Sequence, residues 1–176
     1  WEIYIKDGHT ECVVAWNKLY TRTALENVLY PVGKIREDEF VLHKIVNNCK
    51  RIATIPDCLV YYRQSENSIM ANKTQKRELD YVEACYDRLK FFETHDNVIV
   101  LEDTIIRLIS SIEYYHLDFD ENYEEWKLKI KRECQNAKKK IRFGKARIII
   151  TLYNKNLLPY RIIHKVLCII KNEKEK

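Results

Sequence analysis

The sequence contains little glycine and proline, three residues of each among 176. Tight turns depend on these two residues, so their scarcity disfavours an all-β fold built on many such turns. It also excludes the glycine-rich loops that bind phosphate, because neither G-x-G-x-x-G nor G-x-x-x-x-G-K-[ST] occurs. Hydrophobic residues make up 46% and charged residues 32% of the chain, which is typical of a globular protein and not of a disordered one.

Three further features are absent. No run of about 18 apolar residues occurs, so the sequence predicts no transmembrane helix. None of the six cysteines forms a C-x-x-C pair of the kind that binds zinc, and no signal peptide precedes them. Free thiols in a reducing cytoplasm are the simplest interpretation. We therefore expect a cytoplasmic location, peripheral on the inner face of the cell membrane if the basic end of the chain binds lipid.

The most informative stretch is residues 34–40, KIREDEF, in which Glu37 and Asp38 follow a turn. Apolar residues then recur at helical spacing, which predicts a helix from Glu37 or Asp38 to Cys49. Acidic side chains in its first turn would be favoured by the helix dipole. Two interpretations stay open at this point. The carboxylates form an N-terminal cap, or one of them takes a proton from an incoming hydroxyl group.

Segments rich in β-branched and aromatic residues lie on both sides of this stretch. Residues 13–20, VVAWNKLY, predict a strand, and residues 51–55 and 58–62 predict two more. The polar segment 63–70, RQSENSIM, predicts a loop whose arginine and hydroxyl groups can hold phosphate oxygens. The sequence thus predicts an α/β domain in residues 1–72.

Three blocks in this domain, in this order, resemble the second half of the catalytic domain of family 2 glycosyltransferases. They are VVAWNKLYTR, YPVGKIREDEF and LVYYRQSENSIM, and they cover about residues 10–72. The resemblance is to the bacterial enzymes that build capsular, exopolysaccharide or cell-wall glycans. It implies a GT-A-type fold, an αβα sandwich that uses a nucleotide-diphosphate sugar donor and a divalent metal ion.

The resemblance also implies a reaction. Asp38 would be the general base that deprotonates a hydroxyl of a glycan or lipid-linked acceptor, which then attacks the anomeric carbon and inverts it. Glu37 would orient or support Asp38. A sugar hydroxyl is a poor nucleophile, so a base within hydrogen-bond reach contributes roughly 10²–10⁴ in rate.

The same resemblance assigns the remaining site residues. Trp16, Asn17 and Lys18 would line the acceptor side. Arg63 and Ser68 would close over the diphosphate, whose leaving charge needs positive partners. No metal ligand is assigned within the chain, because no Asp-x-Asp precedes the first block. We therefore expect the donor-binding half, and most ligands of its Mg²⁺ or Mn²⁺, to lie outside this chain, which would be a fragment of the enzyme.

Residues 73–176 predict an all-helical C-terminal region. Apolar residues keep helical spacing over five segments: 79–89, 101–115, 123–141, 145–153 and 159–171. Acidic and asparagine residues at 96–97 and 118–122 supply the breaks between three of them.

Basic and apolar residues alternate over residues 138–171 in this region. Such a pattern is typical of a helix on an anionic membrane surface, or of one packed in a homo-oligomer. Nucleic acid is not expected, because no recognised binding motif accompanies the charge. The alternative to a transferase is a non-catalytic helical module that binds a protein or a membrane, with Glu37 and Asp38 acting only as a cap.

Overall fold

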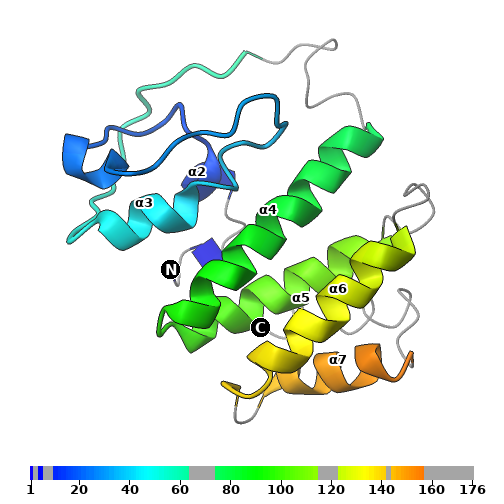
Figure 1. The fold of residues 1–176 in the computed structure, drawn as a ribbon. Helices are drawn as coiled ribbons and strands as arrows, with labels where there is room; N and C mark the ends of the chain where they lie inside the picture. The colour runs from blue at the N-terminus through cyan, green and yellow to red at the C-terminus, as the bar shows by residue number, and fades with distance from the viewer. Residues whose placement is uncertain (2–3, 6–9, 64–73, 115–122, 142–143, 157–176) are drawn as a thin grey trace, which may run out of the picture. The chain divides into compact units, whose positions relative to one another are not determined.

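The computed structural model describes residues 1, 4–5, 10–63, 74–114, 123–141 and 144–156. It divides into two units, Trp1–Ala84 and Cys85–Lys176, which we call the motif unit and the helical unit. The division falls inside the long helix α4 (Gln75–Thr94), which is labelled in Figure 1. Within the described residues every regular element is a helix.

The regular elements of the motif unit that precede α4 are short. They are α2 (Thr10–Val13), the 3₁₀ helix η1 (Arg22–Leu25) and α3 (Leu42–Asn48). η1 packs on α3 through a small apolar cluster formed by Ala24, Val28, Val41 and Ile45. A second cluster joins α2 to α3 through Tyr4, Val13 and Leu42. Both of these apolar clusters are small.

The α/β fold expected from the sequence is wrong for the described residues, which contain no strand. Residues 13–20 begin at the end of α2 and continue through a turn, and residues 51–63 run without regular structure, each of them exposed. Their composition favours extended backbone, but a strand also needs a neighbouring strand to accept and donate its backbone hydrogen bonds. No other described segment provides such a neighbour, so the GT-A-type sandwich is not formed by this part of the chain.

The helix predicted from Glu37 or Asp38 begins later than expected, at Leu42. Residues 36–41 instead form successive turns, in which the Val41 amide donates to the Asp38 carbonyl at 3.2 Å. Arg36 has a positive φ of 66°, which is outside the helical region. The Asp38 side chain also accepts from the Glu39 amide at 2.9 Å, a local bond that competes with helix formation. Asp38 therefore lies in the turn immediately before α3.

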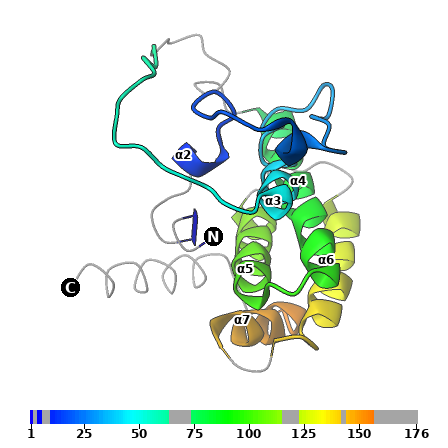
Figure 2. The ribbon, with the colours of Figure 1, turned by 90° about the vertical axis from the view of Figure 1, so that its left-hand side faces the viewer.

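The helical unit contains α5 (Val98–Tyr114), α6 (Tyr123–Ala137) and α7 (Lys145–Asn154), which pack against one another (Figure 2). With α4, they confirm four of the five predicted helices. The fifth, 159–171, lies outside the described residues. None of the described helices combines the length and the apolar character needed to cross a membrane.

Helix α5 lies at the centre of the core of the helical unit. Its start is capped by Asn97, whose side-chain oxygen accepts from the Val100 amide at 3.2 Å, in agreement with the predicted break. Six of its apolar side chains are at most 1% exposed: Val100, Leu101, Ile105, Leu108, Ile109 and Ile112. Burial of this many large side chains is the main stabilising contribution in this unit.

Candidate functional site

The turn that carries Glu37 and Asp38 is held by the first half of α4. The Asp80 carboxylate, 3% exposed, accepts from the Lys34 ammonium group at 2.9 Å and from the Ile35 amide at 2.8 Å. Lys34 also forms an ion pair with Glu83. One nearly buried carboxylate therefore fixes both a side chain and the backbone of this turn.

Three further contacts hold the same turn. The Arg36 guanidinium lies 3.7 Å from a Glu78 carboxylate oxygen and 4.7 Å from the centre of the Tyr81 ring. Lys76 donates to the carbonyl of Gly33, which has a φ of 77° that glycine adopts without strain. Helix α4 thereby determines the path of the backbone that leads to Asp38.

Asp38 is half-buried, and its pKa is raised above the ordinary value. Burial is the main cause, followed by the negative charges of Glu39 and Glu37. A raised pKa makes the carboxylate a stronger base. The environment of Asp38 therefore differs from the sequence-based expectation, in which a helix dipole would favour its charged form.

Two tyrosines and a lysine lie near enough to Asp38 for its charge to act on their pKa values. Tyr20 and Tyr30 influence each other's pKa, and the charge of Asp38 contributes to raising the pKa of both. Burial is the larger cause for each of them. Burial lowers the pKa of Lys18, while Asp38 is among the charges that oppose this shift. Asp38 thus shares its environment with groups from the first sequence block.

Asn17 and Lys18 have a structural use at the C-terminal end of α2. The Asn17 amide donates to the Glu11 carbonyl at 2.9 Å, and the Lys18 ammonium donates to the same carbonyl at 2.7 Å. Lys18 also donates to the Val14 carbonyl. Cationic and amide donors at this position satisfy carbonyls that the helix leaves unpaired.

Trp16 and Tyr62 join the first block to the third. Their rings are stacked, with centroids 5.2 Å apart and an interplanar angle of 5°. Trp16 is 52% exposed and Tyr62 is 51% exposed, so part of the aromatic surface faces solvent. This stack is the only aromatic contact described for residues 51–63.

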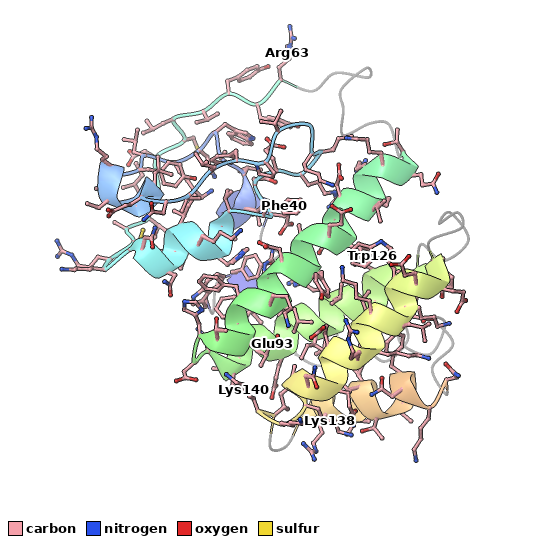
Figure 3. The ribbon with its side chains drawn as sticks, viewed as in Figure 1. Phe40, Arg63, Glu93, Trp126, Lys138 and Lys140 are labelled. Carbon is pink, nitrogen blue, oxygen red and sulfur yellow. The ribbon has the colours of Figure 1, made fainter. Side chains whose placement is uncertain are left out.

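The remaining predicted site residues are Arg63, Glu37 and Ser68. Arg63 is exposed and projects outward at the end of its segment, as Figure 3 shows, and it forms no hydrogen bond or ion pair with other described residues. Glu37 is also exposed. Ser68 lies outside the described residues.

No group of three or more histidine, cysteine, aspartate or glutamate side chains in the described part of the chain could hold a metal ion. The metal ion that the resemblance implies would therefore need ligands from elsewhere, and we assign it no step.

Sequence reasoning missed three residues of this site. Tyr20 lies inside the first block and Tyr30 precedes a proline, but neither position signals that the charge of Asp38 acts on both side chains. Asp80 is 46 residues from Lys34, and no local pattern reports a pair at that separation. Comparisons with protein-family models, curated proteins and solved structures found no match for this chain.

Proposed function

We propose that this chain carries the acceptor-side part of an inverting glycosyltransferase of the family 2 type. The enzyme would transfer a sugar from a nucleotide-diphosphate donor to a glycan or lipid-linked acceptor in bacterial surface polysaccharide synthesis. The observation that supports this most is the environment of Asp38. It is a half-buried carboxylate with a raised pKa, and its charge acts on Lys18, Tyr20 and Tyr30.

In the proposed reaction, Asp38 accepts the proton of the acceptor hydroxyl. The oxygen of that hydroxyl attacks the anomeric carbon of the donor at the same time. The proton passes to the carboxylate, and the bond to the leaving nucleoside diphosphate breaks. Tyr20 and Tyr30 offer hydroxyl groups beside Asp38 that can orient the acceptor. The exposed stack of Trp16 on Tyr62 offers an apolar face for a sugar ring.

The donor side of the reaction is proposed to come from other residues of the complete enzyme. No Asp-x-Asp precedes the first block in this sequence. The Mg²⁺ or Mn²⁺ ion and the nucleotide would be bound mainly by that other part. Arg63 and Ser68 remain the proposed partners of the diphosphate, and their contacts would form when the donor is bound.

The test is the Asp38→Asn substitution in the full protein as it is produced in its native cells. This change removes the basic carboxylate and keeps the size of the side chain and an acceptor for the Glu39 amide. Sugar transfer from a panel of nucleotide-diphosphate sugars should fall by roughly 10²–10⁴, the usual contribution of a general base. Donor binding and far-UV circular dichroism should be unchanged.

The matched control is Asp57→Asn, the same change at an exposed position in residues 51–63. It should retain the wild-type rate. Equal turnover of wild type and Asp38→Asn would reject Asp38 as the base.

A second candidate is a non-catalytic helical module that binds a protein, a membrane or another copy of itself. The observation that favours it is that every regular element in the described residues is a helix. On this alternative, no nucleotide-diphosphate sugar would be consumed, and Asp38→Asn would leave partner binding and sedimentation behaviour unaltered.

A further inference from the structure

Basic residues are concentrated where α6 ends and α7 begins. Six of the ten residues in 138–147 are lysine or arginine, and no aspartate or glutamate occurs in the sequence from residue 134 to residue 172. Figure 3 labels two of these lysines at the end of α6. Four of the described basic residues are exposed, and we call them the basic corner: Lys139, Lys140, Lys145 and Arg147. None of them belongs to the proposed catalytic site, so a role for the basic corner does not depend on the proposed function.

Hydrogen bonds hold the two segments of the basic corner together. The Arg147 guanidinium donates to the carbonyl of Lys138 at 2.9 Å and to the carbonyl of Ile141 at 2.6 Å. The Lys138 ammonium group donates to the Thr151 hydroxyl at 2.7 Å. The turn after α6 is therefore fixed against α7, and the positive charges of the two segments lie close together.

The carboxylates near the basic corner do not neutralise it. Lys140 lies 3.9 Å from Asp96, but the Asp96 side chain is fully exposed, and a surface pair of this kind contributes little. The Glu102 carboxylate lies beside Gly144, the residue that precedes α7. The other two lysines of the corner form no ion pair with any other residue that the structure describes. Four positive charges therefore stand against two negative ones.

Helix stability accounts for only part of this charge. The dipole of α6 favours Lys139 and Lys140, because they follow its C-terminal end. Lys145, however, is the first residue of α7, where the helix dipole disfavours a positive charge. No acidic residue occurs in that first turn to offset it. The position of Lys145 is thus unfavourable within the chain and favourable only towards an external anion.

The apolar face of α7 is already used inside the helical unit. The helix packs on α5 and α6, and four of its side chains are buried: Ala146, Ile149, Ile150 and Tyr153. The face that the sequence offers to a membrane or to a second copy is therefore closed for this helix. Ile148 is the exception, because its side chain is 63% exposed and lies one helical turn after Lys145.

An exposed apolar side chain among cations distinguishes between anionic partners. At a membrane surface, lysine and arginine meet lipid phosphates while apolar side chains enter the boundary with the acyl chains. Proteins that bind single-stranded nucleic acid instead stack bases on aromatic side chains. The described part of 138–156 exposes no aromatic side chain. A lipid surface therefore fits this corner better than nucleic acid does.

We propose that the basic corner binds the anionic surface of a lipid bilayer. The lysines and Arg147 contact the phosphates of the headgroups, and Ile148 enters the interface beside them. Binding is electrostatic and peripheral, because the apolar face of α7 stays in the core of the helical unit. Each basic residue near such a surface strengthens binding about fivefold.

The experiment measures cosedimentation of the full 176-residue chain with lipid vesicles. Vesicles of phosphatidylcholine that contain about 30% phosphatidylglycerol supply the anionic surface, and pure phosphatidylcholine vesicles supply a neutral one. Binding is expected only to the anionic vesicles, and it should be lost when NaCl is raised from about 0.1 M to about 0.5 M, because salt screens exposed charges. No binding to the anionic vesicles, or equal binding to both kinds, would overturn the proposal.

Lys145→Gln is the main variant, and Lys155→Gln is its matched control. Both lysines are exposed, at opposite ends of α7, and both changes remove one positive charge. They lie roughly 15 Å apart along the helix, further than the screening length of about 10 Å at 0.1 M salt. Lys145→Gln should weaken vesicle binding about fivefold, whereas Lys155→Gln should change it less than about twofold. Equal effects would show that net charge alone acts, and would overturn the proposal.

Lys139→Gln combined with Lys145→Gln should weaken binding about 25-fold. Far-UV circular dichroism should match that of wild type, because both side chains are exposed. Wild-type binding by this double variant would overturn the basic corner as the contact. A single-stranded RNA, added at the same phosphate concentration as the anionic lipid, should not displace the chain from the vesicles. Displacement would identify nucleic acid as the better partner and overturn the lipid surface.

Discussion

The two units of this chain hold their residues in place by different means. In the helical unit, large apolar side chains of α5 are at most 1% exposed and helices pack directly on one another. In the motif unit, residues 51–63 are all exposed, and the turn before Asp38 is held mainly by charged contacts with α4. A helix satisfies its own backbone hydrogen bonds, so an apolar stripe is enough to position it. A segment with strand-like composition needs a neighbouring strand for its backbone hydrogen bonds, so its own sequence is not enough to position it.

The largest expected effect tests this difference directly. Ile105→Ala removes a fully buried side chain from α5 and should lower the free energy of unfolding by about 3–4 kcal/mol, because it combines lost burial with a cavity. Leu59→Ala, in the exposed segment, should change it by less than about 0.5 kcal/mol. Urea unfolding followed by far-UV circular dichroism measures both.

The two variants are each other's control, because both truncate a branched four-carbon side chain to a methyl group. Equal losses would mean that residues 51–63 bury their apolar side chains in solution, which would contradict the contrast between the two units.

The same contrast explains which parts of the fold could be predicted from the sequence. Helical spacing is local information, so α4, α5, α6 and α7 were predictable from the apolar residues alone. Strands could not be predicted in the same way. β-Branched and aromatic residues indicate a preference for extended backbone, but they do not show whether a neighbouring strand is present to pair with. Residues 13–20 and 51–63 have the composition of strands and no neighbour to pair with in the described chain.

The candidate site also contains features that could be predicted from the sequence and features that could not. Asp38 was predicted to lie in the first turn of a helix, and the structure places it in the turn before α3 instead. Its raised pKa could not be predicted, because the shift depends on burial and on Glu39 as well as on Glu37. The hydrogen bonds of Asp80 with Lys34 and Ile35 could not be predicted either, because these residues are far apart in the sequence and come together only in the folded chain.

The second prediction removes the contacts of Asp80 with the turn before Asp38, and so tests how the motif unit is stabilised. Asp80→Ala leaves the Ile35 amide without its acceptor and Lys34 without one of its two carboxylates, and should cost about 2 kcal/mol. Glu83→Gln, at a side chain that is 28% exposed, should cost less than about 1 kcal/mol. Urea unfolding gives both values.

A structural readout accompanies this prediction. The backbone amide signals of Ile35 and Asp38 should shift strongly in Asp80→Ala and weakly in Glu83→Gln. If Asp80→Ala were no more destabilising than Glu83→Gln, the turn would be held by something other than this nearly buried carboxylate.

The smallest expected effect concerns Asp38 itself. Its pKa is raised in the folded protein, so the native state binds the proton more tightly than the unfolded chain does. The charged form therefore destabilises the fold above the folded-state pKa. This penalty decreases as pH falls through that value and disappears below the unfolded value of about 3.9. Because Asp38 is half-exposed, solvent screening limits the penalty to a few tenths of a kcal/mol.

Asp38→Asn removes the charge, so it should be slightly more stable than wild type at pH 7 and equally stable near pH 3. Unfolding free energies at the two pH values test this. A variant that is less stable than wild type at pH 7 would show that the carboxylate stabilises the turn and that its pKa is not raised. The predicted sign has a functional meaning as well. A carboxylate that costs stability when charged is one that binds a proton readily, which is the property that the proposed base requires.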